Sequence, residues 1–193
     1  MRVEVVFELD ESSEKLDIPW EGPDPATGYF DLRENPQAIE RLEVARQHPP
    51  LRSFLATVNS ADSLFSTVRC KAWPQPEDSA SEKEPCEFAS RVDIVFAAES
   101  FNFERRHYDD LVRRLQELLT RDATPDYLRA ALRVHLCRFR TLARWGFCLR
   151  ITLYARGATA EQAELRWGLG LARVQQALLF VSRILRQHMA QVS

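Results

Sequence analysis

The chain has few glycines, six in 193 residues, and they form none of the glycine-rich phosphate loops. No G-x-G-x-x-G or G-x-x-x-x-G-K-[ST] pattern occurs, so nucleotide binding by these routes is not expected. No G-x-S-x-G turn is present for an acyl-transfer serine. The one close pair, Gly168 and Gly170, falls inside a predicted helix. Each glycine there costs about 1 kcal/mol relative to alanine, and close approach by another backbone, or a kink, would explain the pair.

Spacings typical of metal and redox sites are also missing. The four cysteines contain no C-x-x-C pair, which argues against a zinc ribbon or a thioredoxin-type motif; they are Cys70, Cys86, Cys137 and Cys148. No two of the four histidines stand three or four residues apart, so a zinc site on one helix face is not supported either. We therefore expect no metal and no cofactor. The cysteines are expected to be free thiols that pack as small apolar side chains.

Long apolar runs are missing as well. No window approaches 18 uninterrupted apolar residues, and the first residues interleave charges with apolar side chains. The sequence therefore predicts neither a membrane span nor a signal peptide, and the expected location is the cytoplasm. Hydrophobic residues make up 45% and charged residues 28% of the chain, both near the average of globular proteins. At this length we expect one soluble α+β domain over residues 1–193.

Lysine is scarce, and the charge is unevenly distributed. Only three lysines accompany 23 arginines. Residues 1–126 carry 15 basic and 26 acidic residues, whereas residues 127–193 carry 11 arginines and two glutamates. Such asymmetry is typical of a nucleic-acid or membrane surface, or of two halves that neutralise each other when folded together.

Apolar spacing predicts the element order β-α-α-β-β-α-α-β-α. Strands are expected over residues 3–7, 63–73, 86–97 and 147–154, and helices from 36, over 51–58, over 103–121, from 125 to 139 and over 159–189. The strand at 63–73 is expected to place Val68, Cys70 and Ala72 on one face. The next strand is expected to do the same with Phe88, Val92, Ile94 and Phe96. Between them, the acidic and proline-rich residues 74–85 predict a mobile hairpin loop.

Without the short helices the order reads β-α-β-β-α-β plus a C-terminal helix, the order of a ferredoxin-like fold. We therefore expect an α+β sandwich: an antiparallel sheet of about four strands with helices on one face and the long last helix closing the core. A helix-grip arrangement, in which a long C-terminal helix lies across a curved antiparallel sheet, is the alternative and needs more strands.

The last helix is apolar on two sides, which predicts burial on two sides. Trp167 to Leu185 form one stripe at alternating spacings of four and three. A second side carries Leu165, Leu169 and Phe180. Because catalytic signatures are missing, we interpret the chain as a non-catalytic binding or protein-interaction domain. The second apolar side predicts that it is a homodimer with these three residues in its interface.

Two alternatives belong to other functional classes. One is a small-ligand binder or an enzyme, with a pocket between sheet and helices lined by Trp73, Phe101, Phe103, His107, Tyr108 and Trp167. In that case His107, three residues before Asp110 on a helix, could act as a general base; local ion pairs in a first helical turn explain the same residues.

The other alternative is a single-stranded nucleic-acid binder. The segment from 129 to 156 has seven arginines, no acidic residue and interleaved aromatic residues. Basic residues that track a backbone between aromatic stacking platforms hold single strands in this way. The candidate contacts are Arg138, Arg140, Arg144 and Arg150. The segment around Phe147 resembles an RNA-recognition motif only loosely, and its alternation predicts that Phe147 faces the core.

Overall fold

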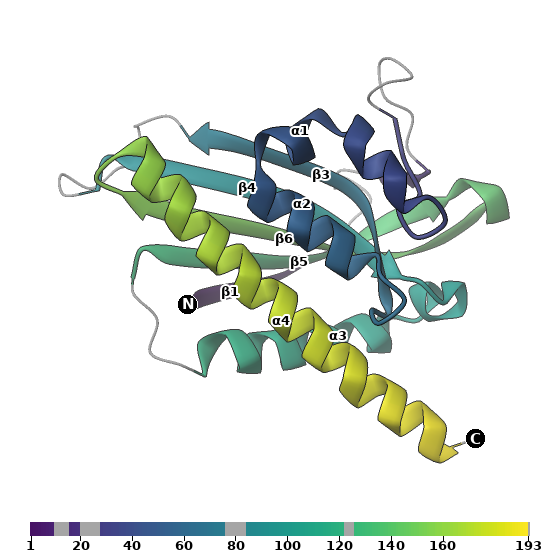
Figure 1. Cartoon of the computed structure of the whole chain (residues 1–193). Helices are drawn as coiled ribbons and strands as arrows, with labels where there is room; N and C mark the ends of the chain where they lie inside the picture. Colours follow the sequence, from purple (N-terminus) through teal and green to yellow (C-terminus); the bar gives the residue numbers. More distant parts are fainter. Residues whose placement is uncertain (10–15, 20–27, 76–83, 122–125, 193) are drawn as a thin grey trace.

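The structure of the protein, a computed structural model, describes residues 1–9, 16–19, 28–75, 84–121 and 126–192, with side chains except those of Gln75 and residues 188–192. Figure 1 shows a sheet crossed by a long C-terminal helix. The strands are β1 (Arg2–Glu8), β2 (Leu16–Ile18), β3 (Phe65–Gln75), β4 (Cys86–Phe96), β5 (Leu128–Phe139) and β6 (Arg144–Gly157). The helices are η1 (Pro36–Arg41), α1 (Glu43–Gln47), α2 (Pro49–Val58), η3 (Glu99–Phe103), α3 (Arg105–Thr120), η4 (Arg140–Leu142) and α4 (Ala160–Val192), where η marks a 3-10 helix.

The described strands form one mixed sheet of six, in the order β1-β5-β6-β4-β3, with β2 also paired to β5. Both β1 and β2 run parallel to β5, and the other neighbours are antiparallel. The α+β class is therefore confirmed. The expected antiparallel sheet of about four strands and its ferredoxin-like order are not found. The long helix across the sheet is closer to the alternative arrangement, although the sheet is mixed.

The largest difference from the sequence-based expectation is residues 125–139, for which we expected a helix and find strand β5. This strand lies inside the sheet, between β1 and β6. Leu128, Leu132 and Val134 pack in the larger core cluster, while Cys137 and Phe139 pack in a smaller cluster on the opposite face. Leu128, Ala131, Leu132, His135 and Phe139 stand at positions i, i+3, i+4, i+7 and i+11, so the same segment also fits a helical spacing.

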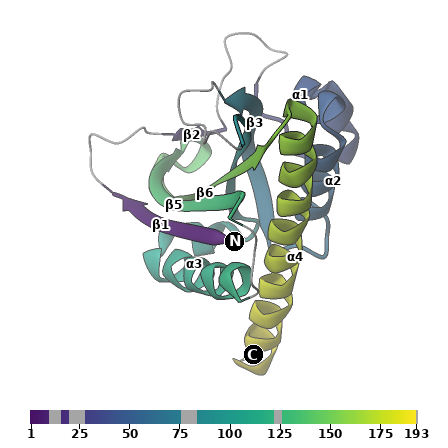
Figure 2. The ribbon, with the colours of Figure 1, turned by 90° about the vertical axis from the view of Figure 1, so that its left-hand side faces the viewer.

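All four α-helices contribute to the larger cluster, which covers one face of the sheet. Figure 2 shows α4 and α2 beside this face and α3 below β1 and β5. Trp167 of α4 is fully buried there and donates a hydrogen bond from Nε1 to Ser90 Oγ on β4 at 2.8 Å. The other face, called the polar face below, carries the smaller cluster around β2 at one end and mostly charged side chains elsewhere.

A register shift in β3 changes which side chains share a face. Pairing with β4 is regular except between Thr67 and Arg69, where one extra residue is inserted. Val68 therefore packs in the smaller cluster, while Cys70 packs against the larger one, so the expected common face of Val68, Cys70 and Ala72 is wrong. A bulge of this kind inverts the alternation beyond it. The expected common face on β4 is confirmed, because its four apolar residues all lie in the larger cluster.

Helices α2, α3 and α4 confirm three of the expected helices within one or two turns at their ends. The helix expected from residue 36 is a 3-10 turn without a side-chain cap, followed by α1. A Cβ at Gly168 would meet the Pro50 ring at 3.0 Å, and one at Gly170 would meet Leu128 and Leu153. Both glycines thus accommodate side chains rather than another backbone. The hairpin β3–β4 is confirmed, and residues 76–83 of its expected loop lie outside the described residues.

Candidate functional site

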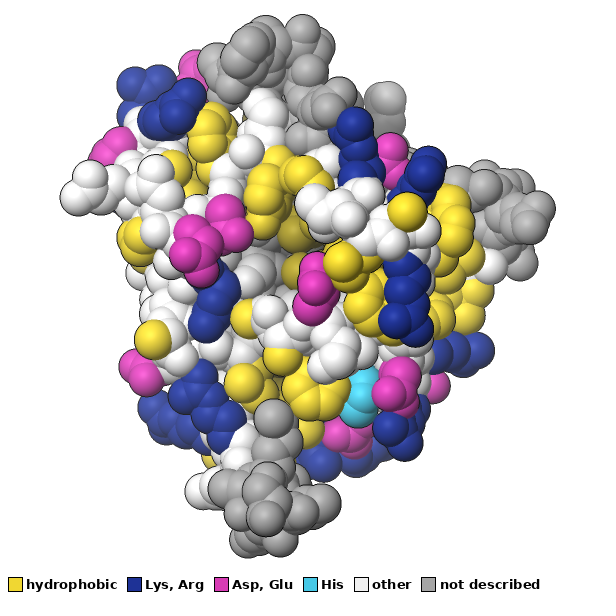
Figure 3. Space-filling view, turned by 90° about the vertical axis from the view of Figure 1, so that its right-hand side faces the viewer, with side chains coloured by type: hydrophobic (Ala, Val, Ile, Leu, Met, Phe, Trp, Pro, Cys, Tyr) yellow, Lys and Arg dark blue, Asp and Glu magenta, His cyan; other side chains and the backbone are white. Residues whose placement is uncertain are grey.

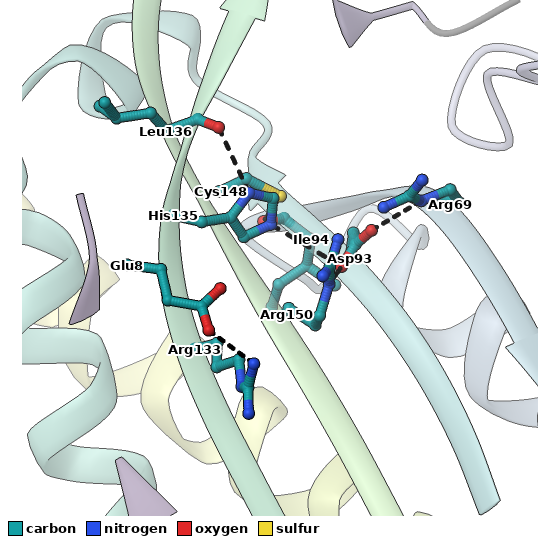
Figure 4. A network of polar contacts seen from close by, with 9 residues as sticks. All are labelled: Glu8, Arg69, Asp93, Ile94, Arg133, His135, Leu136, Cys148 and Arg150. Carbon is teal, nitrogen blue, oxygen red and sulfur yellow. Dashed lines mark hydrogen bonds and ion pairs between the residues drawn. The ribbon is translucent and has the colours of Figure 1, made fainter. Parts of the chain in front are cut away.

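Four strands bring a buried ionic cluster together on the polar face (Figure 4). Asp93 of β4 is fully buried and accepts a hydrogen bond from Arg150 Nε at 2.8 Å and one from Arg69 Nε at 2.9 Å. His135 Nε2 lies 3.9 Å from Asp93 Oδ1, too far for a hydrogen bond, and its Nδ1 faces the Leu136 carbonyl oxygen at 3.3 Å. Neighbouring Arg133 pairs with Glu8 of β1.

This arrangement keeps Asp93 ionised. Burial by itself would raise the pKa of this carboxyl group. His135, Arg150 and Arg69 outweigh burial and hold the Asp93 pKa well below its ordinary value. A buried carboxylate with two arginine partners stabilises the sheet only while both kinds of partner are present, because either one alone would be a buried unpaired charge.

Three thiols whose pKa is affected by Asp93 are poor nucleophiles: Cys137 and Cys148 on the polar face and Cys70 on the opposite face. Burial, followed by the charge of Asp93, raises the pKa of Cys70 to about 12 and the pKa of Cys137 further above its ordinary value. The same two causes raise the pKa of Cys148, whose thiol donates to the Ile94 carbonyl oxygen at 3.3 Å. Because the thiolate is the reactive form, these groups act as packing residues at neutral pH. The four cysteines are free, as expected.

His107 lies beside aromatic rings at the start of α3. Its ring centroid is 4.6 Å from that of Phe101, and its Nε2 is 3.9 Å from Glu104. Burial lowers its pKa despite the neighbouring Glu104. Asp110, which the helical spacing placed opposite His107, is held by Arg113 and Arg114 instead. Local ion pairs in the first turns of the helix therefore account for the charged residues of this segment.

The structure places the six expected pocket residues in different surroundings. Tyr108 and Trp167 are fully buried in the core. The rings of Phe101, His107 and Tyr108 all contact the ring of Phe96. Phe103 instead packs on Phe139 in the smaller cluster. Trp73 lies on β3 with the Lys71 ammonium 5.5 Å from its ring. Ligand binding by these residues stays a prediction.

The four candidate nucleic-acid contacts lie in two places. Arg150 is nearly inaccessible and bonded to Asp93. Arg138, Arg140 and Arg144 lie at the β5–β6 hairpin end, where the Arg144 guanidinium stacks 4.1 Å from the Phe103 ring centroid. Figure 3 shows this end of the molecule, where basic side chains are interleaved with acidic and hydrophobic ones. These arginines therefore do not form one continuous basic track.

The sequence did not indicate a groove that runs along the outer side of β3. Its volume is about 670 Å³, within the usual range of ligand pockets. One wall is β3 from Thr67 to Ala72, and the other is formed by Gly28–Leu32 and by residues 41–47. Only the strand order, which places β3 at the edge of the sheet, reveals this groove.

An exposed apolar stripe follows α4 on the side that faces away from the sheet. Leu165, Leu169 and Phe180 are 67%, 58% and 48% exposed, whereas Trp167, Val174 and Val181 on the opposite side are fully buried. The expectation that Leu169 and Phe180 lie outside the core of one chain is therefore confirmed. The structure contains one chain, and pairing through these residues stays a prediction.

No described helix is long and apolar enough to cross a membrane. Among the residues that the structure describes, no group of three or more His, Cys, Asp or Glu side chains is placed to hold a metal ion. Comparisons with protein-family models, with curated proteins and with solved structures give no significant match. Evidence about function therefore comes from this chain's own surfaces.

Proposed function

We propose that this protein is a non-catalytic interaction domain that pairs with a second copy of itself through α4. The observation that carries the proposal is the exposed stripe of this helix. Its members follow each other at spacings of three or four residues; they are Glu161, Leu165, Leu169, Ala172, Gln176, Phe180 and Arg183. This is the spacing of a helix face that packs against another helix.

The distribution of charge along the stripe favours an antiparallel pair. The N-terminal end carries Glu161, the C-terminal end carries Arg183, and the residues between them are apolar except for Gln176. In a twofold pair centred near Ala172, Leu165 of each copy lies opposite Phe180 of the other. Each Glu161 then lies near the other copy's Arg183. Every contact in such a pair occurs twice, so a self-complementary stripe is the surface that a twofold dimer requires.

The magnitudes favour a reversible dimer. Complete burial of a leucine or phenylalanine side chain contributes at most ~1.5–3 kcal/mol, and association itself has a cost of ~4–15 kcal/mol. No single apolar contact exceeds that cost, so pairing needs the whole stripe. Removal of one large side chain from each copy should therefore be easy to detect.

Multi-angle light scattering on Leu169→Glu tests the proposal. The substitution places a charge in the middle of the apolar stripe of each copy, so the dimer should dissociate at concentrations where the wild type stays paired. Leu142→Glu is the matched control, because Leu142 is 46% exposed but lies at the β5–β6 hairpin. An unchanged mass for Leu169→Glu, or equal effects of the two substitutions, would refute pairing through α4.

A further inference from the structure

The outer edge of β3 presents backbone groups into the groove described above. β3 is the last strand of the sheet on its side, and Figure 1 shows it at this edge near α1. An edge strand with free amide and carbonyl groups is a template on which another extended chain can pair. Which groups of β3 are available follows from its register with β4.

The alternation of hydrogen bonds identifies these groups. The Ala97 N–H donates to the Leu64 carbonyl oxygen at 2.8 Å, so every second residue back along β4 also points its backbone groups at β3. Two of these residues, Asp93 and Arg91, pair with Arg69 and Lys71. Cys70 lies between Arg69 and Lys71, and Ala72 follows Lys71. Both therefore direct their N–H and C=O groups outward, away from β4. Among the residues the structure describes, none outside the β3–β4 ladder bonds to these groups.

On either side of Cys70 and Ala72, the outward backbone groups of β3 are already bonded or are missing. Before Cys70, the Thr67 N–H donates to Asn59 Oδ1 at 2.9 Å, and Arg33 donates from Nη1 to the Phe65 carbonyl oxygen at 3.1 Å. After Ala72 comes Pro74, which occupies the next outward position and has no N–H to offer. Only the stretch that lines the groove remains able to pair, so the edge and the groove form one site.

The side chains around the open edge define what would bind. On the sheet face that carries Cys70 and Ala72, the groove is bordered by apolar Leu42 and Val44. The groove is lined by the basic residues Arg41, Arg46 and Lys71, by Arg69, which is paired with Asp93, and by one acidic residue, Glu43. An added strand places alternate side chains on opposite faces, one set beside the apolar wall and the other beside Lys71.

We propose that this edge binds an extended peptide in which apolar and acidic residues alternate, by addition of a strand to β3. Backbone hydrogen bonds to Cys70 and Ala72 supply sequence-independent affinity, and the two faces supply selectivity. The peptide belongs to another protein, and the charge of the groove selects it. This site is on a different element from α4 and does not depend on dimerisation.

The probe is a fluorescein-labelled octapeptide of alternating Val and Glu, with binding followed by fluorescence anisotropy. Saturable binding is expected, and the same peptide with Lys in place of Glu should not bind. A probe N-methylated at alternate residues cannot complete the backbone hydrogen bonds and should bind about tenfold or more weakly, while the protein itself is unaltered. Equal binding of the methylated and unmethylated probes would contradict strand addition.

Two variants locate the site. Ala72→Pro removes an outward N–H but leaves the ladder to β4 intact, so affinity should fall about tenfold or more. Lys71→Glu should also weaken binding, whereas Arg121→Glu, an exposed charge reversal at the end of α3, should not. Leu169→Glu should bind the probe normally, which separates this proposal from dimerisation. Absence of binding to the wild type, or equal effects of Lys71→Glu and Arg121→Glu, overturns the proposal.

Discussion

Arg150 of β6 donates from Nε to Asp93 Oδ1 of β4 at 2.8 Å, in a region where both side chains are nearly inaccessible to solvent. Arg69 of β3 approaches the other carboxylate oxygen. One carboxylate thus ties three adjacent strands together on the polar face. The same carboxylate holds Arg69, which lines the groove, against β4.

Asp93→Asn should destabilise the fold by about 3–5 kcal/mol, because it leaves two arginines around a neutral side chain. Equilibrium urea unfolding measures this change. The double variant Asp93→Leu, Arg150→Met should lose less than the sum of its single variants, since the two residues share one interaction. Additive losses would mean that the pair contributes little as a pair.

Acid should weaken the fold through the same carboxylate. The folded-state pKa of Asp93 lies well below its ordinary value of about 3.9, so ionisation favours the folded chain. This contribution is complete well above pH 4 and is lost as the pH falls through and below that value. Urea unfolding between pH 7 and pH 3 should therefore show a decline that is shallower in Asp93→Asn. Asp62→Asn, at an exposed position, should retain the wild-type decline.

Native thiol labelling should be limited by burial and protonation. Cys137 and Cys148 are fully buried, and the raised pKa of Cys70 keeps its partly buried thiol protonated. With a chromogenic disulfide reagent at pH 7.5, only Cys86 should react rapidly in the folded chain. All four should react in urea. Rapid native modification of Cys148 would show that the polar face opens readily.

Sequence patterns predicted several elements correctly. The stripe from Trp167 to Leu185 and the amphipathic face of α3 gave the correct helices, and the alternation of apolar and polar side chains around Ile151 gave the correct strand, although both faces of that strand are buried. The prediction for β5 was wrong because Leu128, Ala131, Leu132, His135 and Phe139 also recur at helical spacing. The prediction that Val68 shares a face with Cys70 and Ala72 was wrong because an inserted residue leaves no signal in the sequence of β3 itself.

The ionic cluster and the groove were beyond the reach of sequence patterns for a different reason. Asp93, Arg150 and Arg69 come from three strands, and nothing local to any of them indicates the other two. Their meeting depends on strand order and on register across 81 residues of chain from Arg69 to Arg150. The exposed side of α4 could be predicted because its residues lie on one element.

A charge exchange tests the antiparallel orientation of the proposed dimer. Glu161→Arg and Arg183→Glu should each weaken pairing at low salt, because each places like charges together at both ends of the stripe. The double variant restores opposite charges in an antiparallel pair and should recover most of the affinity. Sedimentation velocity gives the three dissociation constants. Each single effect should shrink at 1 M salt, where such interactions are screened beyond about 3 Å.

The mass of the wild-type chain in solution tests the central claim most directly. Sedimentation equilibrium over a hundredfold range of concentration, at low and high salt, should show a reversible approach to twice the chain mass of 22.3 kDa. The dimer should persist at high salt, because the stripe between Glu161 and Arg183 is apolar except for Gln176. A species of one chain mass at every concentration would contradict the account and leave the exposed residues of α4 without a partner copy.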